Sequence, residues 1–132
     1  MNKSKQQKEY IAFSGEKFVI EWYFDDAGKS SSLEYFDSLT DSEQIKTLGL
    51  FELMGNIGSI KNKTKFNSEG DKLYAFKPQP HRFLCFFFSG GKIIVTNAFH
   101  KKTQKLPKGE KEKALKYKEN YEIRTQRGDY YE

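Results

Sequence analysis

The sequence has few of the residues that build disulfide or metal sites. Its 132 residues include one cysteine, Cys85, so no disulfide pair and no cluster of cysteine ligands can form within the chain. Cys85 lies in an apolar run, so we expect its side chain to be buried and to act as a small hydrophobic residue. The chain also lacks a signal-peptide core and any apolar stretch of the roughly 18 residues that a transmembrane helix needs. We therefore expect a cytoplasmic protein without a membrane segment.

Acidic residues are missing from the stretch Leu73 to Gly109, which holds seven Lys or Arg and no Asp or Glu. Residues 1–72 hold ten basic and twelve acidic residues, and residues 110–132 hold six of each. The formal net charge of +5 therefore originates in this stretch. A basic stretch without acids is typical of a surface that binds phosphate, although many charge runs are only solvated faces.

The length of the chain allows one domain with one core, spanning residues 1–132. Twelve Phe and eight Tyr supply large side chains for that core, which excludes disorder along the whole chain. The N-terminal residues are mostly polar and show no periodicity. We expect residues 1–16 to form a flexible segment.

A β-hairpin is predicted at the centre of the basic stretch. The apolar run Phe83 to Phe88 is followed by Ser89-Gly90-Gly91 and by a second apolar run from Lys92 to Phe99, the spacing of two strands joined by a short turn. Apolar residues occupy consecutive positions in both runs, so both faces of these strands should be covered.

Further elements are predicted on both sides of the hairpin. A strand is expected over 18–24, followed by helices over 33–39 and 41–57, the second capped at Asp41 and stopped by Gly55 and Gly58. In that second helix the apolar ladder contains Ile45, Leu48, Phe51, Met54 and Ile57.

A loop with a possible edge strand is expected over 59–70, and a short strand over 73–77 ends at Pro78. Pro107 should lie in the first turn of a C-terminal helix that continues to about residue 126. The predicted order is an N-terminal strand and helix pair, an antiparallel meander and a final helix. This order indicates the fold class α+β.

Several of these residues resemble a known family. The chain resembles phage-derived Gp49-like proteins, the HigB-like branch of the RelE/ParE toxin superfamily. The resemblance lies in Lys77, His81-Arg82-Phe83, Gly90 to Val95 and Ala98 to Pro107. The paired lysines with Thr103-Gln104, Lys105 and Pro107 are the most specific part. The resemblance covers about residues 18–121 and implies a small RelE-like fold.

The resemblance also implies a function. It indicates the toxin of a type II toxin-antitoxin system, a ribosome-dependent mRNA endonuclease (mRNA interferase) that inhibits translation without a metal or other cofactor. Its partners would be a cognate helix-turn-helix antitoxin, the ribosome and mRNA. Attack of the ribose 2′-hydroxyl on the adjacent phosphate would be aided by basic side chains that stabilise the transition state.

Site residues follow from the same positions. Arg82 matches the arginine that begins the family's third strand, and Lys77 stands where the family usually has an arginine. A lysine there keeps the charge but loses the planar bidentate fork. The catalytic residues implied are Arg82, Lys77, Lys102 and Tyr130. The RNA- or ribosome-binding residues implied are Lys101, Lys105, His100, His81 and Lys92.

Two alternatives stay open. His81 and His100 are either a general acid or base, since imidazole titrates near neutrality, or polar strand-end residues. The protein as a whole is either an endonuclease or a non-catalytic binder of the same fold, such as a phage-derived binding protein or a ParE-like inhibitor of a protein target, because fold alone does not fix function.

Overall fold

The computed structural model describes residues 9–102 and 105–131, so Thr103 and Gln104 of the basic motif lie outside the described residues. The described ranges contain three helices and six strands. They are β1 (Ile11–Ser14), β2 (Val19–Trp22), α1 (Ser31–Asp37), α2 (Asp41–Ile57), β3 (Phe66–Gly70), β4 (Leu73–Phe76), β5 (His81–Phe88), β6 (Lys92–His100) and α3 (Lys108–Arg127).

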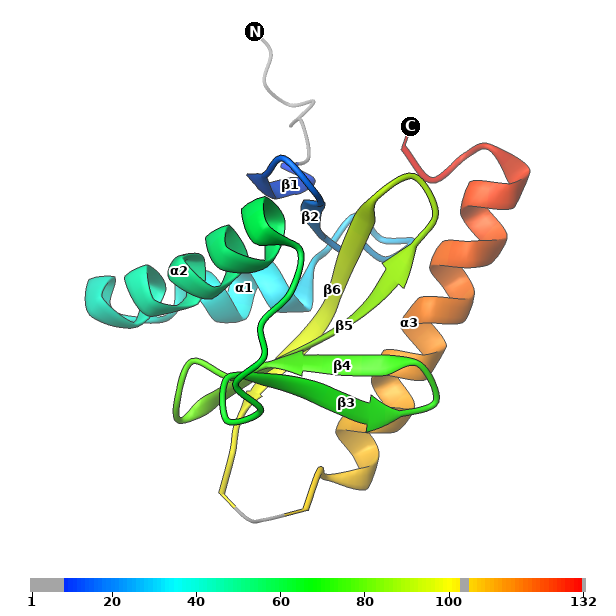
Figure 1. The fold of residues 1–132 in the computed structure, drawn as a ribbon. Coiled ribbons are helices and arrows are strands. Elements are labelled where there is room, and N and C mark those ends of the chain that lie inside the picture. The colour runs from blue at the N-terminus through cyan, green and yellow to red at the C-terminus, as the bar shows by residue number, and fades with distance from the viewer. Residues whose placement is uncertain (1–8, 103–104, 132) are drawn as a thin grey trace, which may run out of the picture.

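All six strands form one mixed sheet in the order β1-β2-β6-β5-β4-β3. Strands β2 and β6 run parallel, and every other neighbouring pair runs antiparallel. Helices α1 and α2 pack on one face, whereas α3 packs on the other (Figure 1). The expected α+β class is confirmed, with a strand and helix pair, an antiparallel meander and a final helix in the arrangement of a small RelE-like fold.

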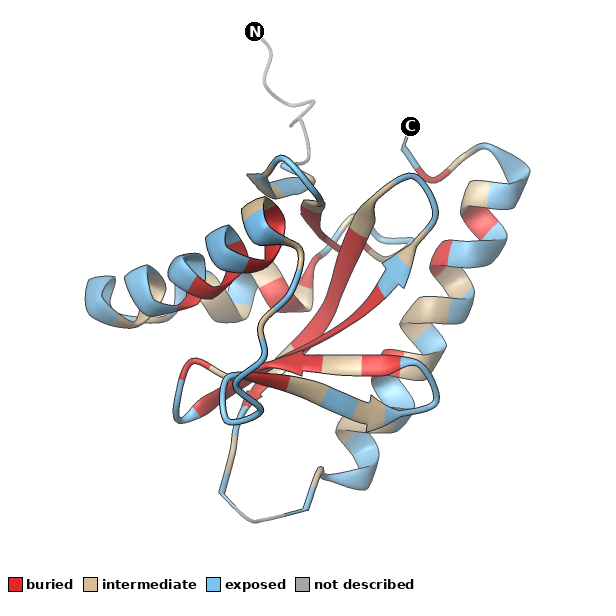
Figure 2. Ribbon diagram, in the orientation of Figure 1, coloured by how far each residue is buried: buried red, intermediate tan, exposed pale blue. Residues whose placement is uncertain are grey.

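The predicted hairpin is confirmed as the pair β5 and β6, and it lies in the middle of the sheet. Along β5 the side chains alternate between two cores: Phe83 and Cys85 pack with residues of α2, while Leu84 and Phe86 pack with residues of α3. Figure 2 shows the buried residues concentrated in these central strands. The consecutive apolar positions are therefore explained by burial on both faces.

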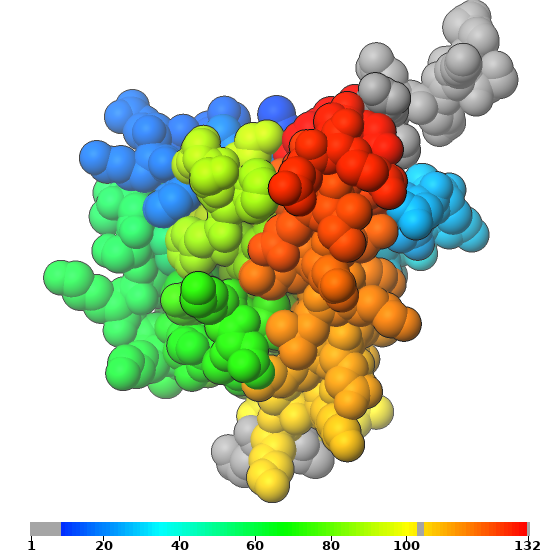
Figure 3. Space-filling view, turned by 90° about the vertical axis from the view of Figure 1, so that its right-hand side faces the viewer, coloured from blue at the N-terminus to red at the C-terminus, as the bar shows by residue number. Residues whose placement is uncertain are grey.

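Helix α3 runs along one face of the sheet, beside the turns of the β3–β4 and β5–β6 hairpins (Figure 3). Ala114 and Tyr121 are fully buried on its inner side. Pro107 is the N-cap, with extended backbone, instead of a first-turn residue as we expected. In the described parts of the chain, none of the helices has both the length and the apolar composition needed to cross a bilayer.

Helix α2 spans the predicted range, but its cap lies one residue earlier than expected. Thr40 is the N-cap: its side chain accepts a hydrogen bond from the Glu43 N–H, and the Glu43 carboxylate accepts one from the Thr40 N–H. The helix ends at Gly58 in the left-handed conformation, as expected, whereas Gly55 lies inside the helix.

The buried face of α2 also differs from our expectation. It consists of Thr47, Leu50, Phe51, Met54 and Gly55, a set with the spacing of one helical face. Ile45, Leu48 and Ile57 were predicted inside and are exposed instead. The reason is geometric: residues spaced strictly three apart rotate around a helix of 3.6 residues per turn and do not share one side.

The N-terminal segment needs a second correction, because β1 lies within residues 1–16, which we expected to be flexible. β1 pairs with β2, and the turn between them docks on the end of α2, where the N–H groups of Lys17 and Phe18 donate to the Gly55 carbonyl oxygen at 2.7 and 3.0 Å. A Cβ added to Gly15 would lie 2.3 Å from the Gly55 carbonyl carbon. β1 is therefore held by a contact that only glycine permits at position 15.

We predict that Gly15→Ala lowers the free energy of unfolding by about 1–3 kcal/mol, because the backbone of α2 must shift to admit the methyl group. The matched control is Gly49→Ala in α2, where nothing lies within 4 Å of the added Cβ. That change should raise the free energy of unfolding by up to about 1 kcal/mol. Urea unfolding at low protein concentration measures both, and equal stability of Gly15→Ala and wild type would contradict the docking.

Candidate functional site

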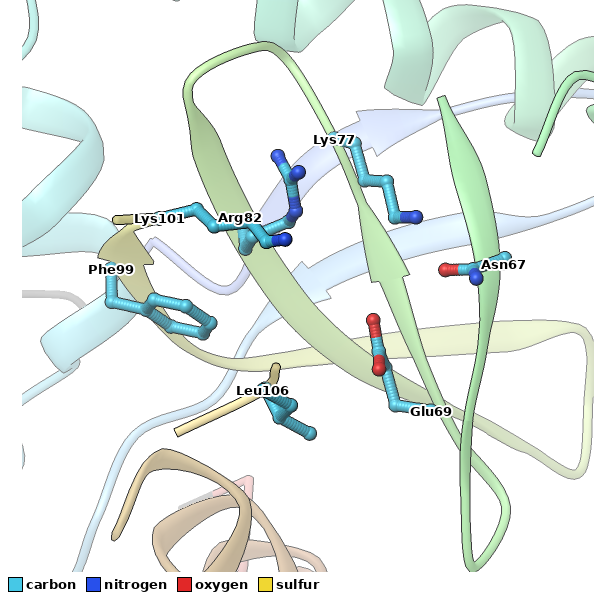
Figure 4. A pocket seen from close by; sticks show the side chains of 7 residues that line it. All are labelled: Asn67, Glu69, Lys77, Arg82, Phe99, Lys101 and Leu106. Carbon is cyan, nitrogen blue, oxygen red and sulfur yellow. The ribbon is translucent and has the colours of Figure 1, made fainter. Parts of the chain in front are cut away.

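A small pocket opens at one end of the sheet, where β4 ends, β5 begins and β6 ends. Antiparallel pairing places these strand ends side by side, with Phe76 opposite Phe83 and Arg82 opposite Phe99. The pocket has a volume of about 120 Å³ and is open to solvent, and it lies on the face of the sheet that α3 covers. It is lined by Asn67, Glu69, Lys77, Arg82, Phe99, Lys101 and Leu106 (Figure 4).

Three of the lining residues are cations that the sequence singled out. Figure 4 shows the Lys77 and Lys101 ammonium groups pointing into the pocket, with the Arg82 guanidinium beside them. The backbone of each is fixed: the Lys77 N–H donates to the Lys65 carbonyl and the Lys101 N–H to the Pro80 carbonyl. Rigid strand ends therefore hold three positive charges around one small space.

Arg82 is the most constrained of the three, with 8% of its surface exposed. Its Nη1 donates to the Gln79 side-chain oxygen at 3.2 Å and to the His81 carbonyl oxygen at 2.9 Å. Burial lowers the pKa of the guanidinium, but arginine stays protonated at neutral pH. Its planar fork is thus held in one orientation, as bidentate contact with a phosphate requires.

Lys77 donates from Nζ to the Lys63 carbonyl oxygen at 3.1 Å. Burial lowers the pKa of its ammonium group, the charges of Arg82 and Lys101 lower it further, and Glu69 opposes this. A lysine with a lowered pKa can bind a phosphate and also release its proton more readily than an exposed lysine.

Glu69 and Asn67 complete the pocket, and the sequence did not indicate either of them. Both come from the edge strand β3, and Glu69 lies at the irregularity between Ser68 and Gly70 in the pairing of β3 with β4. Figure 4 shows the Glu69 carboxylate directed toward the ammonium groups, and its charge partly opposes the lowering of the Lys77 and Arg82 pKa values by burial. A carboxylate that faces cations across an open space can accept a proton from a bound hydroxyl group.

His81 lies on the opposite face of the sheet from Arg82, since neighbouring strand residues alternate. Its ring is buried: Nδ1 lies 2.6 Å from the Tyr35 hydroxyl, and Nε2 lies 2.9 Å from Glu43 Oε2. This network joins α1, β5 and α2. His100 is exposed and its ring lies 5.7 Å from that of His81. The structure therefore places His81 in a buried network away from the pocket, and its predicted contact with RNA stays a prediction.

Lys102 and Lys105 follow β6 and are exposed. Neither lines the pocket, but Lys102 follows Lys101 and Lys105 precedes Leu106, and Lys101 and Leu106 both line it. They extend the positive charge of the pocket onto the neighbouring surface.

Lys92 and Tyr130, two further predicted site residues, do not line the pocket. Lys92 begins β6, at the end opposite His100, and its Nζ donates to the Tyr131 hydroxyl and lies 3.6 Å from Glu21. Tyr130 is 2% exposed, its hydroxyl accepts from the Phe24 N–H at 2.9 Å, and burial raises its pKa. The C-terminal tail therefore packs into the core instead of lying near Arg82.

Cys85 is buried, and burial raises the pKa of its thiol, as suits an unreactive core residue. In the ranges that the structure describes, no group of His, Cys, Asp and Glu side chains is arranged to hold a metal ion.

The His81 network generates a prediction about acid stability. A hydrogen bond from His81, with further bonds from Thr40, lowers the pKa of Glu43 from 4.5 to about 2. A depressed pKa in the folded state stabilises the protein above the unfolded value, and this contribution is lost as the pH falls from 4.5 toward about 2. Glu43→Gln should therefore flatten the loss of unfolding free energy over that range, measured by urea unfolding at several pH values.

The matched control is Glu112→Gln, on the exposed side of α3, which removes the same charge. It should keep the wild-type slope. An unchanged slope in Glu43→Gln would show that the contact with His81 contributes nothing to acid stability.

Comparisons with known proteins place the chain in a family. The profile of the family described as "Phage derived protein Gp49-like (DUF891)" matches residues 34–119, about two thirds of the chain, from α1 into α3. All residues that line the pocket lie within the match, and Tyr130 lies outside it. A search of curated proteins found no match. The chain belongs to the Gp49-like family of phage-derived proteins, which is a family of RelE/HigB-like toxins.

Proposed function

We propose that this protein is the toxin of a type II toxin-antitoxin system and that it cleaves mRNA on the ribosome without a metal ion. The observation that carries this proposal is the pocket in which Lys77, Arg82 and Lys101 converge opposite Glu69. A phosphodiester is the substrate that suits three cations, and a carboxylate beside them suits the removal of a hydroxyl proton.

The reaction is an internal transfer at phosphorus. The 2′-oxygen of one ribose attacks the adjacent phosphorus as its proton passes to a base, and the bond to the 5′-oxygen of the next nucleotide breaks as that oxygen takes up a proton. The products are a 2′,3′-cyclic phosphate and a free 5′-hydroxyl. Negative charge on the phosphoryl oxygens increases in the transition state, so fixed cations lower the barrier.

The four charged residues of the pocket each have a role in this scheme. Arg82 holds the phosphoryl oxygens with its oriented fork, and Glu69 accepts the 2′-hydroxyl proton. Lys77 is the donor for the leaving 5′-oxygen, because its pKa is lowered by burial and by neighbouring charge. Lys101, Lys102 and Lys105 contact the RNA backbone on either side, where phosphate contacts position the chain without reading its sequence.

The partner in this proposal is a helix-turn-helix antitoxin. It would cover the pocket around Lys77, Arg82 and Lys101 or hold the toxin in a position that blocks entry into the ribosome. The same cations would then contact an acidic segment of the antitoxin in the inhibited complex and RNA in the free toxin.

One observation favours the second candidate, a non-catalytic binding protein of the same fold. Lys77 is a point charge where the family usually has an arginine, and an ammonium group cannot form the bidentate contact of a guanidinium. A pocket that binds phosphate without orienting a transition state would serve a binder equally well. Substitution of Arg82 separates the two candidates.

We predict that Arg82→Ala abolishes growth arrest and lowers mRNA cleavage by about 100- to 1,000-fold, because an oriented charge at the transition state is lost. Arg82→Lys should keep RNA binding and lose most of the rate. Induced expression in a bacterial host, with primer extension on translated messages, measures cleavage, and circular dichroism confirms folding. Full cleavage by folded Arg82→Ala would refute the site. A soluble wild type that neither arrests growth nor cuts message would favour the binder.

We also predict a salt dependence of ribosome binding, with log K falling by roughly 0.7 to 0.9 per log unit of salt for each phosphate contact. Lys101→Ala with Lys102→Ala should reduce that slope, because two contacts are removed. The control pair is Lys29→Ala with Arg127→Ala, exposed cations remote from the pocket. Binding measured against salt concentration tests this, and an unchanged slope in the first pair would make both lysines solvated surface residues.

A further inference from the structure

A second hollow lies beside the edge strand β3, on the face of the sheet that α2 covers. It is an open groove with a volume of about 470 Å³, compared with about 120 Å³ for the pocket. The residues that line it include Lys61, Lys63, Phe66, Asn67 and Tyr74. Its volume lies within the range of small-ligand sites, roughly 300–1,000 Å³.

The floor of the groove is aromatic. The rings of Phe66 and Tyr74 lie parallel with 5.7 Å between their centroids, and Phe87 meets the Tyr74 ring edge-on at 5.1 Å. Phe66 is buried, whereas Tyr74 is half-buried and Phe87 is 38% exposed. Unpaired nucleobases stack on aromatic rings of this kind, because every base has a π-face. The neighbouring rings hold Tyr74 in place, so little side-chain freedom is lost when a base stacks on it.

The rim of the groove is basic. Residues 53–68 contain Lys61, Lys63 and Lys65 and no Asp or Glu. All three lysines are exposed, and none forms an ion pair with another residue that the structure describes. Figure 2 shows the segment between α2 and β3 as exposed over most of its length. Lysines beside aromatic rings are complementary to a single-stranded nucleic acid, since the lysines attract phosphates and the rings stack with bases.

The groove adjoins the pocket through β3, because Asn67 lines both hollows. The lysine segment is also attached to the pocket, since the Lys77 ammonium group donates to the Lys63 carbonyl oxygen and the Gln79 side chain donates to that of Thr64. In the described ranges β3 is the last strand on this side of the sheet. A chain bound in the pocket therefore reaches the groove by passing around one strand.

Asn67 supplies an acceptor at this junction. Its Oδ1 atom is buried and has no hydrogen-bond partner among the described residues. Figure 4 shows the Asn67 side chain directed from β3 into the pocket. A buried acceptor without a partner costs stability, so a ligand that donates a hydrogen bond to it is favoured. Ribose hydroxyl groups and the amino groups of bases are such donors in RNA.

We propose that this groove is a nucleobase subsite for single-stranded RNA. The base of a nucleotide next to the cleaved one stacks on Tyr74, and Lys61 and Lys63 contact its backbone. Asn67 accepts a hydrogen bond from the RNA where it passes around β3. The inference rests on the proposed function in one respect, that the ligand in the pocket is RNA, and it does not require cleavage. Because stacking tolerates any base, the subsite adds affinity without reading sequence.

The test is binding of a short oligouridylate that carries one 2-aminopurine, to the full chain free of antitoxin. Stacking on an aromatic ring quenches the emission of 2-aminopurine, so the wild type should bind the probe and quench it. Tyr74→Leu should lower the affinity at least about fivefold and remove the quenching, whereas Tyr74→Phe should keep both. The matched control is Tyr117→Leu, which removes a half-buried tyrosine from a stacked pair on α3 and should behave like wild type. Circular dichroism confirms folding.

The lysines are tested by salt dependence. Lys61→Ala with Lys63→Ala should weaken binding and reduce the slope of log K against log salt by roughly 0.7 for each lysine, the value for single strands. The control pair is Lys46→Ala with Lys116→Ala, exposed cations that do not line the groove. A double-stranded RNA of the same length should bind Tyr74→Leu as well as wild type, because its bases are already stacked on each other.

Four outcomes would overturn the proposal. A wild type that neither binds nor quenches the probe excludes the subsite. A folded Tyr74→Leu that binds and quenches like wild type, in a protein that still cuts message, excludes the subsite but keeps the endonuclease. Equal losses for single-stranded and double-stranded RNA in Tyr74→Leu exclude base stacking. Hydrogen exchange that shows residues 59–74 protected by the antitoxin and by no RNA assigns the groove to the antitoxin.

The converse result separates the two proposals in the other direction. A wild type that quenches the probe through Tyr74 but cuts no message supports the subsite and refutes the cleavage.

Discussion

The fold depends on one constraint, the burial of both faces of the β5–β6 pair. Phe83 and Cys85 need the cover of α2, while Leu84 and Phe86 need the cover of α3, so neither helix layer can be removed without exposing half of the hairpin. A bulge between Leu84 and Cys85 shifts the register of the pair, and the Thr96 hydroxyl donates to the Leu84 carbonyl at this point. A bulge increases the local twist of a strand pair. The strand ends at the pocket therefore point in a different direction from the ends near the β5–β6 turn.

The pocket follows from this constraint. A strand that is buried along its length has exposed side chains only near its ends, so the cations of the basic stretch collect where β4, β5 and β6 begin or end. Arg82 is the most enclosed of them, because only 8% of it is exposed and its hydrogen bonds to Gln79 and His81 fix the guanidinium beside the pocket. Glu69 adds the only acidic side chain among the lining residues, and it enters from a strand outside the acid-free stretch.

The sequence predicted the hairpin, both N-terminal helices and the cations at the strand ends, because apolar runs and proline turns are strong local signals. It did not predict Glu69, since β3 is a polar edge strand whose register depends on pairing with β4. The distance of Tyr130 from the pocket was not predictable for a different reason. Helix α3 begins beside the pocket and has 20 residues, a length of about 30 Å, so its C-terminal tail reaches the far end of the sheet. Helix length, not residue type, decides where that tail lies.

The side chains of two neighbouring residues, His81 and Arg82, lie on opposite faces of the sheet. Alternation along β5 directs His81 toward α1 and α2, where Tyr35 and Glu43 hold it, and directs Arg82 toward the pocket beside α3. The sheet lies between the two surfaces. A molecule bound in the pocket therefore lies on the α3 side of the sheet and does not contact the network that His81 forms with Tyr35 and Glu43 on the other side.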